Sequence, residues 1–150
     1  MQALNFPSYQ FSTRIVGERT EIFDQFRKKY VVLTPEEWVR QHLLRFLVEE
    51  RSYPPGLISV EKSIDVNGLQ RRYDAVVFDR SGKPLMIIEC KAPSVAVTQQ
   101  VFDQVYAYSM NIPASFYFIS NGIIHAVVKK AQGSAAAFLD DIPSYIEINS

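Results

Sequence analysis

The sequence predicts an α/β (α+β) fold with an αβββαβ core, in which helices flank a central mixed sheet, preceded by an N-terminal β ribbon. Three observations support this prediction. Residues 34–51 carry the signals of an amphipathic helix, residues 57–91 hold three strand-like segments separated by hairpin turns, and a second helical segment precedes a last strand pair. With 150 residues the chain fits one domain, divided into an N-terminal β extension (1–33), a core (34–130) and a C-terminal tail (131–150).

The N-terminal extension has the pattern of a small β ribbon. Short apolar stretches alternate with polar residues over 9–33. Gly17 and Glu18 interrupt the pattern and indicate a turn. We expect the ribbon to lead directly into the first helix of the core.

The first helix is predicted over 34–51 from its start, its periodicity and its end. Thr34 is a favourable N-cap, Pro35 suits the first helical position, and Glu37 stands where a reciprocal capping box needs a glutamate. Apolar residues recur at helical spacing from Val39 to Leu47. The proline and glycine residues of 53–56 then end the helix.

Three sequential strands are predicted after this helix, over 57–64, 72–79 and 84–91. Asn67-Gly68 and Ser81-Gly82 lie between them and favour hairpin turns. The third strand has an apolar run without alternation, which is typical of a strand covered on both faces. It should therefore lie in the centre of the sheet.

The rest of the core is predicted as a helix and a strand pair. Residues 98–110 have helical periodicity, and the strands 115–120 and 123–128 flank a turn at Asn121-Gly122. In the tail, residues 138–142 favour a short helix.

Composition excludes several kinds of protein and site. With 47% hydrophobic and 21% charged residues, the chain is neither disordered nor fibrous. Basic and acidic residues number 16 each, so nucleic-acid binding would need a local basic patch. One cysteine, Cys90, excludes an internal disulfide, and His42 and His125 are far apart, so any metal should be bound by oxygen.

No membrane span or secretion signal is expected. The longest apolar runs, such as Leu85 to Ile88, are far shorter than the roughly 20 residues that cross a bilayer. The first residues lack a basic segment followed by an apolar one. We therefore expect a cytoplasmic protein.

Two carboxylates and a lysine gather where the second and third predicted strands meet. If these strands form a hairpin, Asp74 can lie beside Glu89, and Lys91 points to the same side as Glu89. Paired carboxylates favour a hard cation such as Mg²⁺ or Mn²⁺, and an adjacent ammonium suits phosphodiester hydrolysis. A solvated strand end is the alternative interpretation. Cys90 should point away from Lys91, which disfavours a thiol nucleophile.

This constellation, on this order of elements, resembles the PD-(D/E)xK nuclease superfamily and its restriction-endonuclease-like fold. Two longer strings, LTPEEWVRQH (33–42) and IECKAPS (88–94), resemble the N-terminal nuclease domain of type I restriction enzyme R subunits. The resemblance extends from about Phe23 to Lys129. It implies a Mg²⁺-dependent DNA endonuclease, with Mn²⁺ as a substitute ion.

The resemblance also implies roles for individual residues. Asp74 and Glu89 would be metal ligands, the Cys90 backbone carbonyl a further ligand, and Lys91 the catalytic lysine. Tyr73 stands where the motif has proline, a departure that the superfamily tolerates.

Further residues would support this site. Gln104 and Tyr108 match a Gln-x-x-x-Tyr helix pattern of the family. An acidic residue of the first helix often joins the metal site in the superfamily, and helical spacing favours Glu36 over Glu37 for that place. Arg71 and Arg72 adjoin the site and would contact DNA phosphates, although both also fit ordinary solvated charge.

The R subunits continue into a motor, but this sequence has no phosphate-binding Gly-x-x-x-x-Gly-Lys-Ser/Thr loop. We therefore expect a stand-alone copy that binds no nucleotide cofactor and either acts alone or uses a separately encoded motor or specificity subunit. Because type I systems recognise their sites through a specificity subunit, little intrinsic sequence preference is expected. The alternative is a catalytically silent DNA-binding or protein-interaction module of the same fold, acting with a restriction or repair partner.

Overall fold

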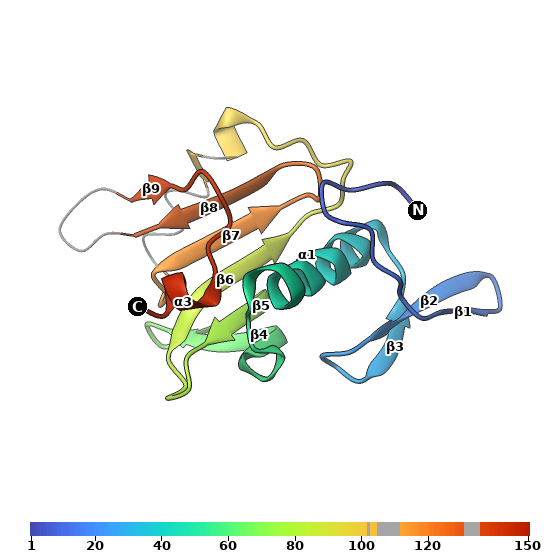
Figure 1. Cartoon of the computed structure of the whole chain (residues 1–150), viewed down its shortest axis with the longest axis horizontal. Helices are drawn as coiled ribbons and strands as arrows, with labels where there is room; N and C mark the ends of the chain where they lie inside the picture. Colours follow the sequence, from blue (N-terminus) through green and yellow to red (C-terminus); the bar gives the residue numbers. More distant parts are fainter. Residues whose placement is uncertain (102, 105–111, 131–135) are drawn as a thin grey trace.

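The computed structural model describes residues 1–101, 103–104, 112–130 and 136–150. It contains a six-stranded mixed sheet in the order β4-β5-β6-β7-β8-β9 and a three-stranded antiparallel sheet in the order β1-β2-β3. The elements are β1 (Thr13–Val16), β2 (Arg19–Asp24), β3 (Lys29–Val32), α1 (Pro35–Arg51), η1 (Pro55–Leu57), β4 (Ile58–Val66), β5 (Leu69–Phe78), β6 (Pro84–Cys90), β7 (Phe116–Ser120), β8 (His125–Lys129), β9 (Ala137–Phe138) and α3 (Tyr145–Ile148). Helix α1 lies along one face of the large sheet, and the small sheet extends beside it (Figure 1).

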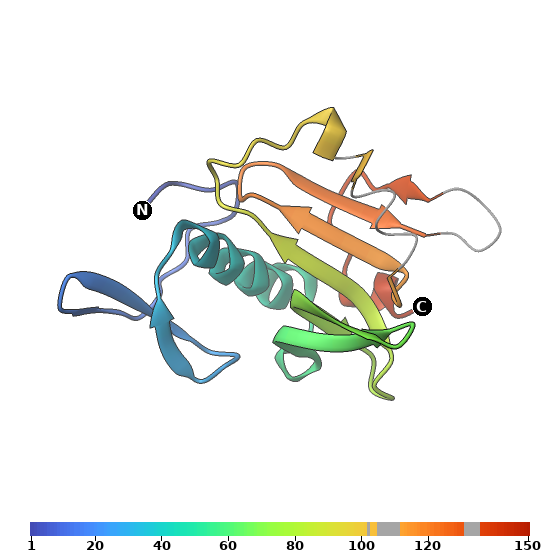
Figure 2. The same cartoon turned by 180° about the vertical axis from the view of Figure 1, so that it is seen from behind.

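The small sheet is the predicted N-terminal ribbon. Gly17, with φ +63°, lies in the turn between β1 and β2, where a positive φ is easiest for glycine. Its inner end carries a buried ion pair, because the Asp24 carboxylate accepts a hydrogen bond from the Arg27 side chain and Asp24 is fully buried. Arg27 also pairs with Glu37 of α1 at 2.7 Å, and the ribbon lies beside α1 in both views (Figures 1 and 2).

Helix α1 starts where the sequence predicts, but only half of the capping box forms. The Thr34 hydroxyl accepts a hydrogen bond from the Glu37 backbone N–H at 3.0 Å. The Glu37 carboxylate does not return to the Thr34 backbone; it accepts hydrogen bonds from Arg27 at 2.7 Å and Gln41 at 3.0 Å. A long-range charge partner on the ribbon therefore replaces the local cap that we predicted.

The two predicted hairpins of the core form. Asn67 and Gly68, both with positive φ, make the two-residue turn that joins β4 to β5, and Val66 pairs with Leu69. Strand β6 pairs antiparallel with β5 and parallel with β7, which makes it central and the sheet mixed. Four consecutive side chains, Leu85 to Ile88, are buried, as the uninterrupted apolar run predicted.

The segments after β6 confirm the prediction where they are described. Residues 99–101 and 103–104 are helical, and the rest of the predicted helix, including Tyr108, lies outside the described residues. Strands β7 and β8 flank the turn at Asn121-Gly122. Gly122 has φ +87°, and a Cβ there would lie 2.7 Å from the Leu4 side chain, so the turn needs glycine.

The predicted helix at 138–142 is wrong. Phe138 belongs to β9, and the C-terminal helix starts only at Tyr145, where Ser144 and Glu147 form a complete capping box. The Tyr145 hydroxyl donates a hydrogen bond to the Phe78 carbonyl at 3.1 Å, and Ile148 is buried in the core beside α1. These contacts hold the C-terminus against the sheet.

Apolar side chains fill both faces of the large sheet. One cluster joins α1, α3 and the face of the sheet that they cover, and another joins the opposite face with residues such as Ile112 and Ala136. Within the described part of the chain, no helix combines the length and the apolar character needed to cross a membrane.

Candidate active site

Asp74 and Glu89 meet at the carboxyl end of β6, next to the first half of α1. The β5–β6 ladder ends at the pair Ala75 and Ile88, and Asp74 and Glu89 are the next residues on the two strands. The Asp74 Oδ2 accepts a hydrogen bond from the Cys90 backbone N–H at 2.6 Å. This bond fixes one oxygen of Asp74 and leaves Oδ1 for another partner.

Burial and the neighbouring Asp74 carboxylate change the protonation of Glu89. Burial, together with the charge of Asp74 and a hydrogen bond with its carboxylate, raises the pKa of Glu89 to about 8. The positive charge of Lys91 acts in the opposite direction, and Glu36 adds to the rise. Without a cation, the pair therefore holds a proton at neutral pH.

This shared proton gives a stability prediction. In EDTA, the free energy of unfolding should fall as pH rises from about 4.5 to about 8, because Glu89 ionises in the unfolded chain before it does in the folded one. One pKa unit corresponds to about 1.4 kcal/mol, so the loss due to Glu89 should exceed about 2 kcal/mol. Urea unfolding of wild type and Glu89→Gln across this range measures it.

The quantity to compare is the difference between wild type and Glu89→Gln. Burial lowers the pKa of His42 and His125, and these residues make stability rise with pH in both proteins. The variant should therefore gain stability relative to wild type as pH rises. A difference that stays constant from pH 5 to 8 would mean that Glu89 has no raised pKa.

Glu89 is followed by a buried residue, Cys90, and then by an exposed one, Lys91. Lys91 is exposed, and its backbone N–H donates a hydrogen bond to the Ser120 carbonyl at 2.8 Å. The Cys90 side chain is buried, and burial raises the pKa of its thiol well above the ordinary value. A protonated, enclosed thiol is a poor nucleophile, so only the backbone carbonyl of Cys90 is a candidate ligand.

The structure separates the two glutamates of the first helical turn. Glu36 contributes to the raised pKa of Glu89, so its charge acts on the site. Glu37 is buried in the hydrogen bonds with Arg27 and Gln41 described above. The preference for Glu36 over Glu37 and the role of Glu36 as a metal ligand both stay predictions.

Sequence reasoning missed Arg40, which lies beside the acidic pair. Only 6% of Arg40 is exposed, and its Nη2 lies 3.7 Å from Glu36 Oε1 and 4.0 Å from Asp74 Oδ1. The signal available in the sequence was its spacing, because Arg40 stands one helical turn after Glu36 on α1. Arginine on an amphipathic helix is usually solvated, so this spacing alone did not single it out.

Glu61 is a second residue that the sequence did not reveal. The pairs Val60–Ala75 and Lys62–Tyr73 flank it, so Glu61 lies opposite Asp74 at a gap in the β4–β5 ladder. Its φ of +53° is unusual for glutamate, and such backbone strain is concentrated at functional sites. Although burial opposes its charge, the neighbouring Arg72, Arg27 and Arg40 lower the pKa of Glu61.

The remaining predicted residues lie at the surface or outside the description. Arg71 and Arg72 are exposed on β5 just before Asp74, and Arg72 donates a hydrogen bond to Glu61 at 2.6 Å. Gln104 is exposed, and no contact among the described residues joins it to the acidic pair. Tyr108 falls in the part of the chain that is not described.

The donor set fits a hard divalent cation with few protein ligands. No three His, Cys, Asp or Glu side chains in the described ranges are grouped closely enough to hold a metal ion. Asp74 and Glu89 therefore offer two carboxylates, and the neighbouring backbone adds a carbonyl. Mg²⁺ commonly binds through one or two carboxylates and keeps several waters, so this arrangement suits it.

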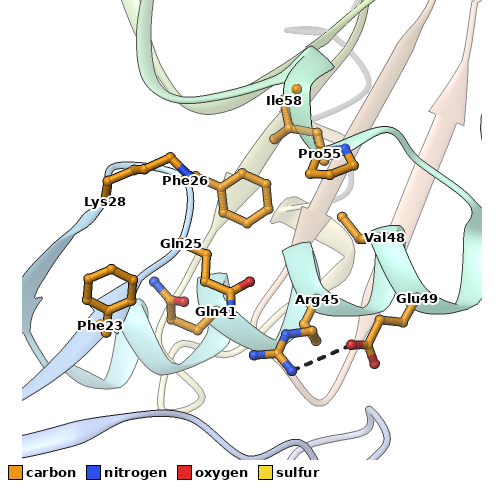
Figure 3. A pocket seen from close by; sticks show the side chains of 11 residues that line it. Phe23, Gln25, Phe26, Lys28, Gln41, Arg45, Val48, Glu49, Pro55 and Ile58 are labelled. Carbon is orange, nitrogen blue, oxygen red and sulfur yellow. Dashed lines mark ion pairs between the residues drawn. The ribbon is translucent and has the colours of Figure 1, made fainter.

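A separate cavity of about 620 Å³ lies on another side of α1, between that helix, the ribbon and η1 (Figure 3). Phe23 and Phe26 line it from the ribbon and its turn, and Gln41, Arg45 and Glu49 line it from α1. Arg45 and Glu49 form an ion pair at 3.6 Å, drawn as a dashed line in Figure 3. None of the predicted metal ligands lines this cavity.

Comparisons with known proteins agree with the sequence resemblance. Residues 35–143 match the family model described as type I restriction enzyme R protein N terminus. The fold is similar to a solved fragment described as an HsdR subunit of a type I restriction enzyme from Vibrio vulnificus YJ016, with a TM-score of 0.56 and 18% identity. That match covers 78% of this chain and 25% of the other chain. A search of curated proteins finds no match.

Proposed function

Because the chain belongs to the family of type I restriction enzyme R protein N-termini, we propose that it is a Mg²⁺-dependent DNA endonuclease domain with little sequence specificity. The observation that carries the proposal is the placement of Asp74 and Glu89 side by side at the end of the β5–β6 ladder, with Lys91 two residues beyond Glu89. Two partly buried carboxylates side by side at a strand end destabilise each other unless a cation lies between them, so this arrangement favours metal binding.

Each of these residues has a distinct task in the proposed reaction. Asp74, Glu89 and the Cys90 carbonyl would hold the ion, and the negative charge of Glu36 would add to its attraction. A bound Mg²⁺ or Mn²⁺ supplies Lewis acidity toward the phosphodiester and lowers the pKa of a bound water. The Lys91 ammonium, exposed beside the acidic pair, orients the attacking water and offsets the charge that develops on the phosphate.

DNA would approach over the exposed end of this sheet. Arg71 and Arg72 are exposed on β5 next to Asp74 and would contact phosphates, which positions the backbone without reading bases. Gln104 and Tyr108 would help to position the site or the DNA. With equal numbers of acidic and basic residues, the chain has no general attraction to DNA, so these local contacts matter.

The chain spans about a quarter of the length of the HsdR fragment that it matches. Motor and specificity functions would therefore come from other polypeptide segments or from separate subunits. Such partners would choose where cleavage occurs, because the phosphate contacts proposed for Arg71 and Arg72 carry no sequence information.

Cleavage of DNA by the purified protein tests the proposal. Supercoiled plasmid, linear duplex and single-stranded DNA are each incubated with the protein in Mg²⁺, Mn²⁺ or EDTA, alongside Glu89→Gln. We expect cleavage that requires the metal and disappears in the variant, with product ends that share no sequence motif. Cleavage that persists in EDTA would contradict the proposal, and absence of cleavage under all conditions would favour the non-cleaving module.

A further inference from the structure

Four carboxylates surround the Arg40 guanidinium. Within the described ranges, two of its three nitrogen atoms nevertheless donate no hydrogen bond. Besides Glu36 and Asp74, its guanidinium lies 3.8 Å from Glu37 and 3.5 Å from Glu61. Among the described residues, its buried Nε and Nη1 have no hydrogen-bond partner. Four acidic side chains from α1, β4 and β5 thus surround one cation through charge alone.

Because the contact between Arg40 and Asp74 Oδ1 is longer than a hydrogen bond, this oxygen can still coordinate a cation. Oδ2 is bound by the Cys90 backbone N–H, and Oδ1 has Arg40 as a neighbour at 4.0 Å. The same Nη2 atom is 3.7 Å from Glu36, so the guanidinium lies between the two carboxylates. A cation that bridged Asp74 and Glu36 would have to lie against this fixed positive charge.

The net charge of the whole cluster also indicates room for one divalent ion only. Arg27 pairs with Asp24, Glu37 and Glu61, and Arg72 pairs with Glu61. In the part of the chain that the structure describes, the charged side chains of this cluster and its ion pairs comprise six carboxylates and four cations. Once a metal displaces the proton of the Asp74–Glu89 pair, the remaining charge is one that a single divalent ion cancels. The carboxylates are Asp24, Glu36, Glu37, Glu61, Asp74 and Glu89, and the cations are Arg27, Arg40, Arg72 and Lys91.

We propose that the Arg40 guanidinium is a permanent positive charge within the metal site. It lies between Asp74 and Glu36 and thereby limits the site to one divalent ion. This inference rests on the proposed function, because it concerns the same metal. Arg40 is a positioning residue, since it acts through the carboxylates and has no place among the reacting groups. Its buried stem and fixed position suit this role better than a mobile surface lysine would.

Mn²⁺ binding by the full chain tests this role without relying on cleavage. Titration with Mn²⁺, followed by the electron paramagnetic resonance signal of the free ion, gives the number of bound ions and their affinity. Wild type should bind one Mn²⁺ per chain. Arg40→Gln should bind the first ion about tenfold more tightly, or bind a second, because a positive charge a few ångströms away is removed.

Two variants separate charge from structure. Arg40→Lys restores the positive charge and should return binding to one ion with nearly wild-type affinity. Arg45→Gln makes the same substitution on another side of α1, where Arg45 pairs with Glu49, and should leave Mn²⁺ binding unchanged. Two ions bound to wild type, or identical binding by wild type and Arg40→Gln, would overturn the inference.

The remaining outcomes are also informative. If circular dichroism shows that Arg40→Gln does not fold, Glu36→Gln replaces it as the test, since the Glu36 side chain is 46% exposed. In Glu36→Gln the guanidinium has one neighbouring carboxylate fewer, so Mn²⁺ binding should weaken several-fold; the same change combined with Arg40→Lys separates the direct attraction of Glu36 from the role of Arg40, and equal affinity of Glu36→Gln and wild type would count against that role. If wild type and Glu89→Gln both bind no Mn²⁺, the metal site of the proposed function fails, and this inference fails with it.

Discussion

Replacing Lys91 with alanine should reduce metal-dependent DNA cleavage by at least about 100-fold, the effect of removing one group that stabilises transition-state charge. The side chain of Lys91 is exposed and contributes no packing, and its backbone hydrogen bond to Ser120 persists in the variant. The melting temperature should therefore change little, whereas loss of this positive charge beside Glu89 should strengthen Mn²⁺ binding, as expected for Arg40. Cleavage rates measured with plasmid under single-turnover conditions, together with Mn²⁺ titration and thermal unfolding, check the three expectations.

Lys83→Ala provides the matched control for this substitution. Lys83 is equally exposed and precedes the opposite end of β6, so its removal takes the same charge from the chain at a distance from Asp74 and Glu89. The control should cleave at the wild-type rate. Equal activity of Lys91→Ala and Lys83→Ala would show that Lys91 takes no part in the reaction.

Replacing Arg27 with methionine should destabilise the protein by about 3 kcal/mol or more. The Arg27 side chain is only 16% exposed and pairs with Asp24, which is fully buried, and with the buried Glu37. Methionine leaves both carboxylates without their main cation, and an uncompensated buried charge costs about 3–5 kcal/mol. Equilibrium unfolding in urea at neutral pH measures the change.

Arg14→Met tests whether the large loss of stability expected for Arg27→Met is due to the burial of the Arg27 ion pairs. Arg14 pairs with Glu21 on the same ribbon, but its side chain is 53% exposed, and Glu21 keeps a second partner in Arg19. Because Arg14 is exposed and the buried Glu21 keeps Arg19 as a partner, we expect a loss of less than about 1 kcal/mol. Similar losses of stability in Arg14→Met and Arg27→Met would contradict the special position of Arg27 between the ribbon and α1.

Most elements could be predicted because their signals are local. The Asn67-Gly68 turn sets the register of β4 against β5, and that register continues to the end of both strands. The apolar run in β6 identified the central strand. Once β5 and β6 were predicted as a hairpin, the proximity of Asp74 and Glu89 followed, and the Cys90 N–H bond to Asp74 agrees with it.

The features that were missed depend on contacts between distant segments. Arg27 on the ribbon draws the Glu37 carboxylate away from the capping box, which no local pattern could indicate. Arg40 and Glu61 join the site only because α1 and β4 converge on Asp74 in the folded chain. The tail was misjudged for a related reason, since the pairing of β9 with β8 prevails over weak helical preferences at Phe138.

A crystal of the protein soaked in Mn²⁺ would show the metal site itself, since the ion is located by its anomalous scattering. The arrangement described here predicts one peak per chain, coordinated by Asp74, Glu89 and the backbone carbonyl of Cys90, with Arg40 between Asp74 and Glu36. No peak in a Glu89→Gln crystal is the corresponding expectation. A wild-type crystal without a peak at the acidic pair, or with its only peak elsewhere, would contradict the assignment of this site as a metal-dependent nuclease centre.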